Sequence, residues 1–196
     1  LVSGMDNSCD ILISNAHAVI PKIGIIETDI LVENGKIKSL QKSTSNVQAS
    51  TRIDARGKYV LPGAIDPHVH YGVYTPIEEA ARTESRSAAV GGVTTMMRML
   101  RLYDDSYHAI QEQLQASKDS HYVDYAIHAS ILKREQVKDI GYLKSIGVNS
   151  LKIYMNLGAD LNHIYMDLNP GQHQIMEGKV NMDDELLSSI VAEGAK

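Results

Sequence analysis

The chain has 196 residues, a hydrophobic fraction of 43% and a formal net charge of −5. This length fits one domain or two small ones, and the apolar content is sufficient for a buried core. No basic stretch indicates a nucleic-acid or membrane-surface partner, and no apolar run reaches the roughly 18 residues of a transmembrane helix. The single cysteine, Cys9, excludes an intramolecular disulfide and is typical of the reducing cytoplasm, the expected location.

The first sixty residues predict a small β unit. Asn34-Gly35 is a strong signal for a two-residue hairpin turn, and residues 42–50 are polar and indicate a loop. We place a domain boundary after residue 60, so that 1–60 supply the β segment of a small sandwich domain and 61–196 a second domain. Short strands are expected over residues 11–20, 29–32, 36–40, 52–54 and 58–61.

After residue 60 the pattern changes to alternating strands and helices. Thr75 and Pro76 indicate a helix start, with threonine as the cap and proline at the first helical position. Residues 157–181 are rich in Asn and Gly and show little periodicity. About four β/α units with a parallel sheet are therefore predicted. The expected strands end at His70 or cover 93–100, 122–128 and 150–155, and the expected helices cover about 76–90, 104–117, 133–145 and 183–196.

Two histidines, His68 and His70, lie two residues apart at the end of an apolar run. Side chains alternate between the two faces of a strand, so both imidazoles should point the same way while Val69 packs. Two imidazoles directed at one point can supply two ligands to a metal ion. A histidine pair without a metal role remains the alternative on this spacing alone.

Lys152 is the second residue with distinctive chemistry, because it lies inside an apolar strand. The ordinary interpretation is a solvent-facing or salt-bridged lysine, since a buried ammonium is costly without a partner. Alternatively, desolvation near other cations favours the neutral amine. That amine can react with carbon dioxide to give a carbamate, N6-carboxylysine, whose carboxylate can bridge two metal ions.

Three segments resemble the cyclic amidohydrolases, the family of dihydropyrimidinases, hydantoinases, dihydroorotases and allantoinases. They are Gly57-Lys-Tyr-Val-Leu-Pro-Gly-Ala-Ile-Asp-Pro-His-Val-His70, Ser87-Ala-Ala-Val-Gly-Gly-Val-Thr-Thr95 and Ser150-Leu-Lys-Ile-Tyr-Met155. The resemblance implies an α/β fold, a (β/α)8 TIM-type barrel with a small β-sandwich domain. It also implies that His68, His70 and carboxylated Lys152 bind two divalent metal ions, with zinc expected. Tyr71 becomes a candidate for substrate binding.

For the full-length parent, the resemblance implies hydrolysis of a dihydropyrimidine- or hydantoin-type cyclic amide by a metal-activated water. A small-molecule substrate and a homo-oligomer, a dimer or tetramer, are the implied partners. Dihydroorotase or allantoinase activity is one alternative. A non-enzymatic assembly protein related to dihydropyrimidinase is a second alternative, and a structural zinc site is a third.

The sequence departs from the family at several positions. Dihydroorotases follow the histidine pair with an apolar residue and an arginine, where this chain has Tyr71-Gly72. Leu157 stands where hydantoinases carry a substrate-binding tyrosine, and Arg98 stands where the second strand usually ends in Asp. A complete barrel needs about 250 residues, and only about half of one follows residue 60. We therefore expect a first half-barrel, truncated before strand five and inactive alone, with the catalytic Asp beyond residue 196.

Overall fold

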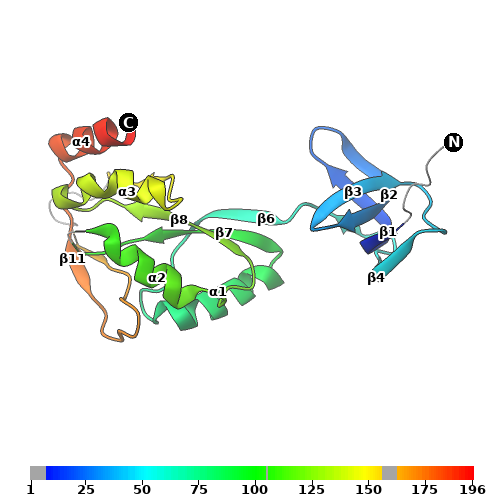
Figure 1. Cartoon of the computed structure of the whole chain (residues 1–196), viewed down its shortest axis with the longest axis horizontal. Helices are drawn as coiled ribbons and strands as arrows, with labels where there is room; N and C mark the ends of the chain where they lie inside the picture. Colours follow the sequence, from blue (N-terminus) through cyan, green and yellow to red (C-terminus); the bar gives the residue numbers. More distant parts are fainter. Residues whose placement is uncertain (1–7, 105, 156–162) are drawn as a thin grey trace. The chain divides into compact units, whose positions relative to one another are not determined.

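The computed structural model describes residues 8–104, 106–155 and 163–196 of the chain. The chain divides into two compact units, Leu1–Pro62 and Gly63–Lys196. Figure 1 shows the strands of the first unit and the mixed helices and strands of the second. The change from a β pattern to an alternating β/α pattern therefore agrees with the sequence prediction.

The first unit is a five-stranded sheet in the order β3-β2-β1-β4, with β5 also paired to β1. Asn34 (φ 52°) and Gly35 (φ 71°) both have positive φ at the tip of the β2–β3 hairpin, which confirms the predicted turn. The predicted polar loop is shorter than expected, because residues 48–50 join a strand that pairs in parallel with β1. The strands are β1 Ser8–Ile20, β2 Gly24–Glu33, β3 Lys36–Gln41, β4 Gln48–Asp54 and β5 Tyr59–Val60.

Strand alternation buries small and aliphatic side chains of the first unit in two clusters. Cys9, Leu12 and Leu31 belong to one cluster, and Ala16 and Ile30 belong to the other. Cys9 is a free, buried thiol, in line with its apolar surroundings.

The second unit is built on a four-stranded sheet in the order β6-β7-β8-β9, and every neighbouring pair is parallel. Helices follow the strands, so the unit is a partial, parallel half-barrel of β/α units (Figure 1). The strands are β6 Ala64–Val69, β7 Val93–Leu100, β8 Asp124–Ser130 and β9 Leu151–Lys152; the helices are α1 Ile77–Val90, η1 Tyr107–Ala109, α2 Ile110–Ser117, η2 Arg134–Asp139, α3 Ile140–Ser145 and α4 Asp184–Gly194.

Several boundaries differ from the sequence prediction. Pro76, and not Thr75, is the N-cap residue of α1, and no side chain caps that end. The predicted strand over 150–155 is reduced to β9, because pairing with β8 is limited to Leu151 and Lys152. The predicted second and third helices begin with the 3-10 turns η1 and η2. Within 157–181, β10 His163–Tyr165 pairs antiparallel with β11 Glu177–Lys179.

The core of the second unit lies between the sheet and its helices. Leu100 and Ile127 of the sheet share a buried cluster with helix residues such as Ile110, Leu143 and Ile190. No helix among the described residues combines the length and the apolar character needed to cross a membrane.

The same clusters define which face of the sheet is free for a site. Val69 packs against the helix-side cluster of Tyr71, and Leu151 packs against the larger helix-side cluster. Side chains alternate along a strand, so His68 and Lys152, the neighbours of Val69 and Leu151, lie on the opposite face of the sheet. His70 follows directly after the end of β6.

Candidate metal centre

The two histidines at the end of β6 point to one place. Their Nε2 atoms are 3.2 Å apart, and their ring planes are inclined by 58°. Two nitrogen ligands at 2.0–2.1 Å from one tetrahedral ion would be separated by about 3.3 Å. The predicted common direction of His68 and His70 is therefore confirmed. Their Nε2 spacing is that of a hydrogen bond between the rings and also fits two ligands of one ion, so the ligand role stays a prediction.

The electrostatic surroundings keep His70 neutral. Partial burial, followed by the charges of Arg101, His68, Lys152 and Arg98, lowers the pKa of His70 from its usual 6.5 to about 4. The ring is therefore unprotonated near pH 7, with a lone pair available to a metal ion. Asp66 adds a local support, because its carboxylate accepts a hydrogen bond from the backbone N–H of His68 at 3.1 Å.

Lys152 lies at the end of β9, where its strand pairs with Ser130 of β8. Its Nζ is 5.3 Å from the centroid of the Tyr154 ring. Its charge contributes to the lowered pKa of His70, so the amine lies within electrostatic range of the histidine pair. Among the described residues Lys152 forms no ion pair with a carboxylate, and its side chain is only partly exposed. The salt-bridged interpretation therefore has no support in this part of the chain.

The described residues do not contain a complete conventional metal site. Over 8–104, 106–155 and 163–196, no group of three or more His, Cys, Asp or Glu side chains is arranged to hold an ion. His68 and His70 supply two ligands, so further ligands must be of another kind or come from other residues. Leu157, predicted to replace a substrate-binding tyrosine, lies outside the described residues.

Tyr71 follows the histidine pair and is almost fully buried, with 5% of its surface exposed. Its hydroxyl is 2.8 Å from Nε2 of His121, and the His121 ring stacks on Tyr125 at 3.9 Å between centroids. Burial raises the pKa of Tyr71 to about 12. No local pattern indicated this pair, because its two partners are 50 residues apart and only the fold brings them together. The role of Tyr71 in substrate binding stays a prediction.

A pocket of ≈ 300 Å³ lies directly beside His70. Tyr74 and Tyr165 form two of its walls, and their rings meet edge to face at 5.9 Å between centroids. Arg101 supplies a cation to the same pocket. The pocket beside His70 is therefore lined by two aromatic rings, by the guanidinium of Arg101 and by the acidic side chain of Glu84.

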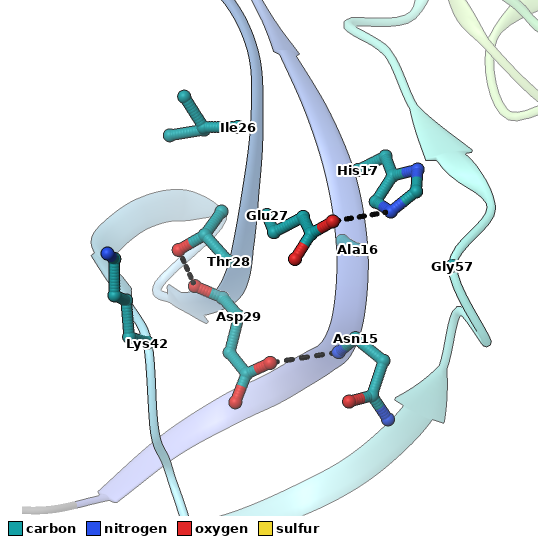
Figure 2. A pocket seen from close by; sticks show the side chains of 9 residues that line it. All are labelled: Asn15, Ala16, His17, Ile26, Glu27, Thr28, Asp29, Lys42 and Gly57. Atoms are coloured by element: carbon teal, nitrogen blue, oxygen red, sulfur yellow. Dashed lines mark hydrogen bonds and ion pairs between the residues drawn. The ribbon is translucent and has the colours of Figure 1, made fainter.

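A larger pocket of ≈ 590 Å³ lies in the first unit and does not involve the histidine pair (Figure 2). His17 Nε2 is 3.4 Å from the carboxylate of Glu27, and Asp29 accepts hydrogen bonds from Asn15 N and Thr44 Oγ1. These polar groups already satisfy one another. The histidine pair of the second unit is therefore the better candidate for chemistry.

Comparison with known proteins identifies similar chains. No family model matches the sequence. L-hydantoinase of Paenarthrobacter aurescens is 45% identical over 92 residues, which are 46% of this chain and 20% of that protein. Dihydroorotase of Methanosphaera stadtmanae is 32% identical over 155 residues, which are 76% of this chain and 34% of that protein.

The folds agree as well. The solved structure of an L-hydantoinase (dihydropyrimidinase) from Arthrobacter aurescens aligns with a TM-score of 0.73 and 28% identity, covering 93% of this chain and 37% of that one. The chain thus spans between a fifth and just over a third of the length of these relatives.

Proposed function

The chain belongs to the cyclic amidohydrolases, the family of hydantoinases, dihydropyrimidinases and dihydroorotases, and we propose that its protein hydrolyses a cyclic amide with a metal-activated water. This activity is proposed for the whole protein, because the chain spans only part of its relatives. The carrying observation is the 3.2 Å separation of the Nε2 atoms of His68 and His70.

The donor set fits a divalent ion of the zinc type. His68 and His70 would hold the ion through Nε2, and the lowered pKa of His70 keeps that ligand unprotonated. When bound, such an ion lowers the pKa of a coordinated water to ~7 and polarises the carbonyl of the amide. A catalytic aspartate from another part of the protein is the expected proton carrier.

Lys152 is proposed to act as a carbamate that bridges two metal ions. The support is the place of Lys152 in the chain: it lies at the end of β9, and its charge acts on His70, so the amine is close to the histidine pair. Its side chain is only partly exposed, and no carboxylate pairs with it among the described residues.

The favoured substrate is a hydantoin- or dihydropyrimidine-type ring. The pocket beside His70 has aromatic walls from Tyr74 and Tyr165, which suit an uncharged ring substituent. The arginine that dihydroorotases carry after the histidine pair is absent, because Tyr71-Gly72 take that place.

Dihydroorotase activity remains the second candidate for one structural reason. Arg101 lines the same pocket, and a guanidinium can bind a carboxylate through two parallel hydrogen bonds, although Nη2 of Arg101 is already 3.6 Å from the carboxylate of Asp167. Arg101 does not lie directly after the histidine pair, where dihydroorotases carry their arginine, so it would bind the substrate carboxylate from a different strand.

The proposal is tested on the whole protein, expressed with zinc supplementation. We expect near two equivalents of zinc by elemental analysis and ring opening of hydantoin or dihydrouracil, with slower turnover of dihydroorotate. The control is the double variant His68→Asn/His70→Asn, which should lose both metal and activity. Near-zero zinc in the wild-type protein would rule the proposal out, and faster turnover of dihydroorotate would establish the second candidate.

A further inference from the structure

Arg98 is a buried cation in the core between sheet and helices. It lies on β7 between Met96 and Leu100, whose side chains both belong to helix-side clusters. Only 3% of its side chain is exposed. Burying a guanidinium is costly unless its donors are occupied, so the bonds that Arg98 makes indicate what it does.

Those hydrogen bonds lead to the backbone carbonyl groups of the two residues that follow the histidine pair. Arg98 donates through Nε to the carbonyl oxygen of Tyr71 at 2.9 Å and through Nη1 to Oε1 of Gln113 at 3.2 Å. Gln113, on α2, donates to the carbonyl oxygen of Leu168 at 2.7 Å. The backbone N–H of Leu168 in turn donates to the carbonyl oxygen of Gly72 at 2.7 Å. Tyr71 and Gly72 are thus each held by a hydrogen bond to the backbone carbonyl, one from Arg98 and one from Leu168.

Gly72 allows this close approach. Its φ is +89°, and a Cβ placed there would lie 2.4 Å from Nη2 of Arg98. The guanidinium therefore occupies the space that a side chain at position 72 would need. The backbone turn and the arginine fit together only because residue 72 is glycine.

Asp167 links the same arginine to the wall of the pocket. Its side chain is fully buried, its Oδ2 accepts from Arg101 N at 2.5 Å, and its Oδ1 is 3.7 Å from Nη2 of Arg98. Two residues earlier, Tyr165 lines the pocket beside His70. One buried charge network therefore joins the end of β7 to both the histidine strand and the pocket wall.

We propose that Arg98 is a positioning residue: it fixes the Tyr71–Gly72 peptide and so holds His70 at metal-binding distance from His68. The inference rests on the proposed function, because the geometry to be held is that of a metal site. Arg98 would act without touching the metal or the substrate itself. Partners of ligands in an outer shell typically change metal affinity or activity by roughly 10- to 100-fold when they are lost.

The test measures zinc affinity by chelator competition on the intact protein, together with kcat and KM. Each variant is assayed at a temperature well below the midpoint of its own thermal unfolding. A variant that is merely less stable is then still folded and should keep the wild-type zinc affinity. Arg98→Met should weaken zinc binding by about 10- to 100-fold and lower kcat more than it raises KM. Arg98→Lys should recover part of the loss, because an ammonium can donate to Tyr71 but cannot reproduce the two-armed geometry. Arg86→Met, at an exposed arginine of α1, is the matched control and should match the wild type.

The possible results separate the two proposals. Wild-type zinc affinity and kcat in Arg98→Met would overturn the positioning role and leave the proposed function intact. A wild-type protein without zinc would overturn the proposed function, and the positioning role with it. If Arg98→Met does not fold, Arg98→Gln replaces it, because it removes the Nε donor to Tyr71 and keeps a polar side chain at the buried position. A several-fold loss of zinc affinity in that variant supports the role, and an unchanged affinity overturns it.

Discussion

Replacing Gly72 by alanine is expected to destabilise the second unit far more than an ordinary glycine substitution. The residue has φ +89°, and the added methyl group would lie 2.4 Å from Nη2 of Arg98. Arg98 cannot easily move aside, because Nε and Nη1 are hydrogen-bonded and the side chain is 3% exposed. The alanine therefore has an unfavourable backbone conformation and also clashes with a buried guanidinium.

Gly92 provides a matched control within the same unit. Its φ is +86°, and nothing lies within 4 Å of an added Cβ. A left-handed backbone costs a non-glycine residue about 1–2 kcal/mol, so Gly92→Ala should lose that amount. Gly72→Ala should lose about 1.5–3 kcal/mol more, because displacing Arg98 breaks hydrogen bonds made by a charged group.

Unfolding by urea and by heat measures this difference. For 150–250 residues, 1 kcal/mol corresponds to about 2–4 °C in Tm, so the two variants should differ by several degrees. In an Arg98→Ala background the two glycine substitutions should cost the same. Equal destabilisation of both variants in the wild-type background would refute the reasoning, since the contact with Arg98 would then carry no energy.

Three further predictions address the candidate site. Lys152→Ala should reduce the activity of the whole protein by more than ~100-fold, a larger loss than removing a residue that only supports a ligand usually causes, and a short carboxylic acid should restore part of it. Lys152→Arg should also be inactive, because a guanidinium stays protonated and cannot form a carbamate. A wild-type-like rate from Lys152→Arg would end the carbamate proposal. Tyr71→Phe should cost about 1 kcal/mol in unfolding by urea, since the bond to His121 is lost, and an increase in KM without this loss would instead assign Tyr71 to substrate binding. In metal-free protein, the free energy of unfolding should fall as the pH drops from 6.5 to about 4, because His70 takes up a proton in the unfolded chain but not in the folded one, where its pKa is about 4. The urea midpoint of the wild type should therefore be lower at pH 5 than at pH 7. In His70→Gln this difference between the two midpoints should be smaller.

Much of the fold follows from local patterns in the sequence. The limits of β7, Val93–Leu100, match the prediction at both ends, because a short apolar run between Gly91-Gly92 and polar residues leaves little choice. The hairpin at Asn34-Gly35 is equally local, since these residues accept the positive φ values that the turn requires. The common direction of His68 and His70 was predicted from strand alternation, and it holds although β6 ends at Val69, one residue before His70.

Other features depend on which strand has a neighbour. The strand predicted over 150–155 is only two residues long in the sheet, because β8 offers pairing partners only to Leu151 and Lys152. Residues 48–50, polar and predicted as loop, extend β4 because β1 runs beside them. Neither result can be read from local propensity, since hydrogen bonds between strands depend on segments far apart in the chain.

Local residue patterns were enough to predict the candidate ligands, their alternation and the kind of fold that carries them. The surroundings of those residues depend on how distant segments pack. Arg98 was visible as a departure from the family, but its partners Tyr71, Gln113 and Asp167 lie between 15 and 69 positions away. A buried charge acquires its role from groups that other elements bring to it, because its cost can be offset only by contacts that form when the sheet and helices pack together.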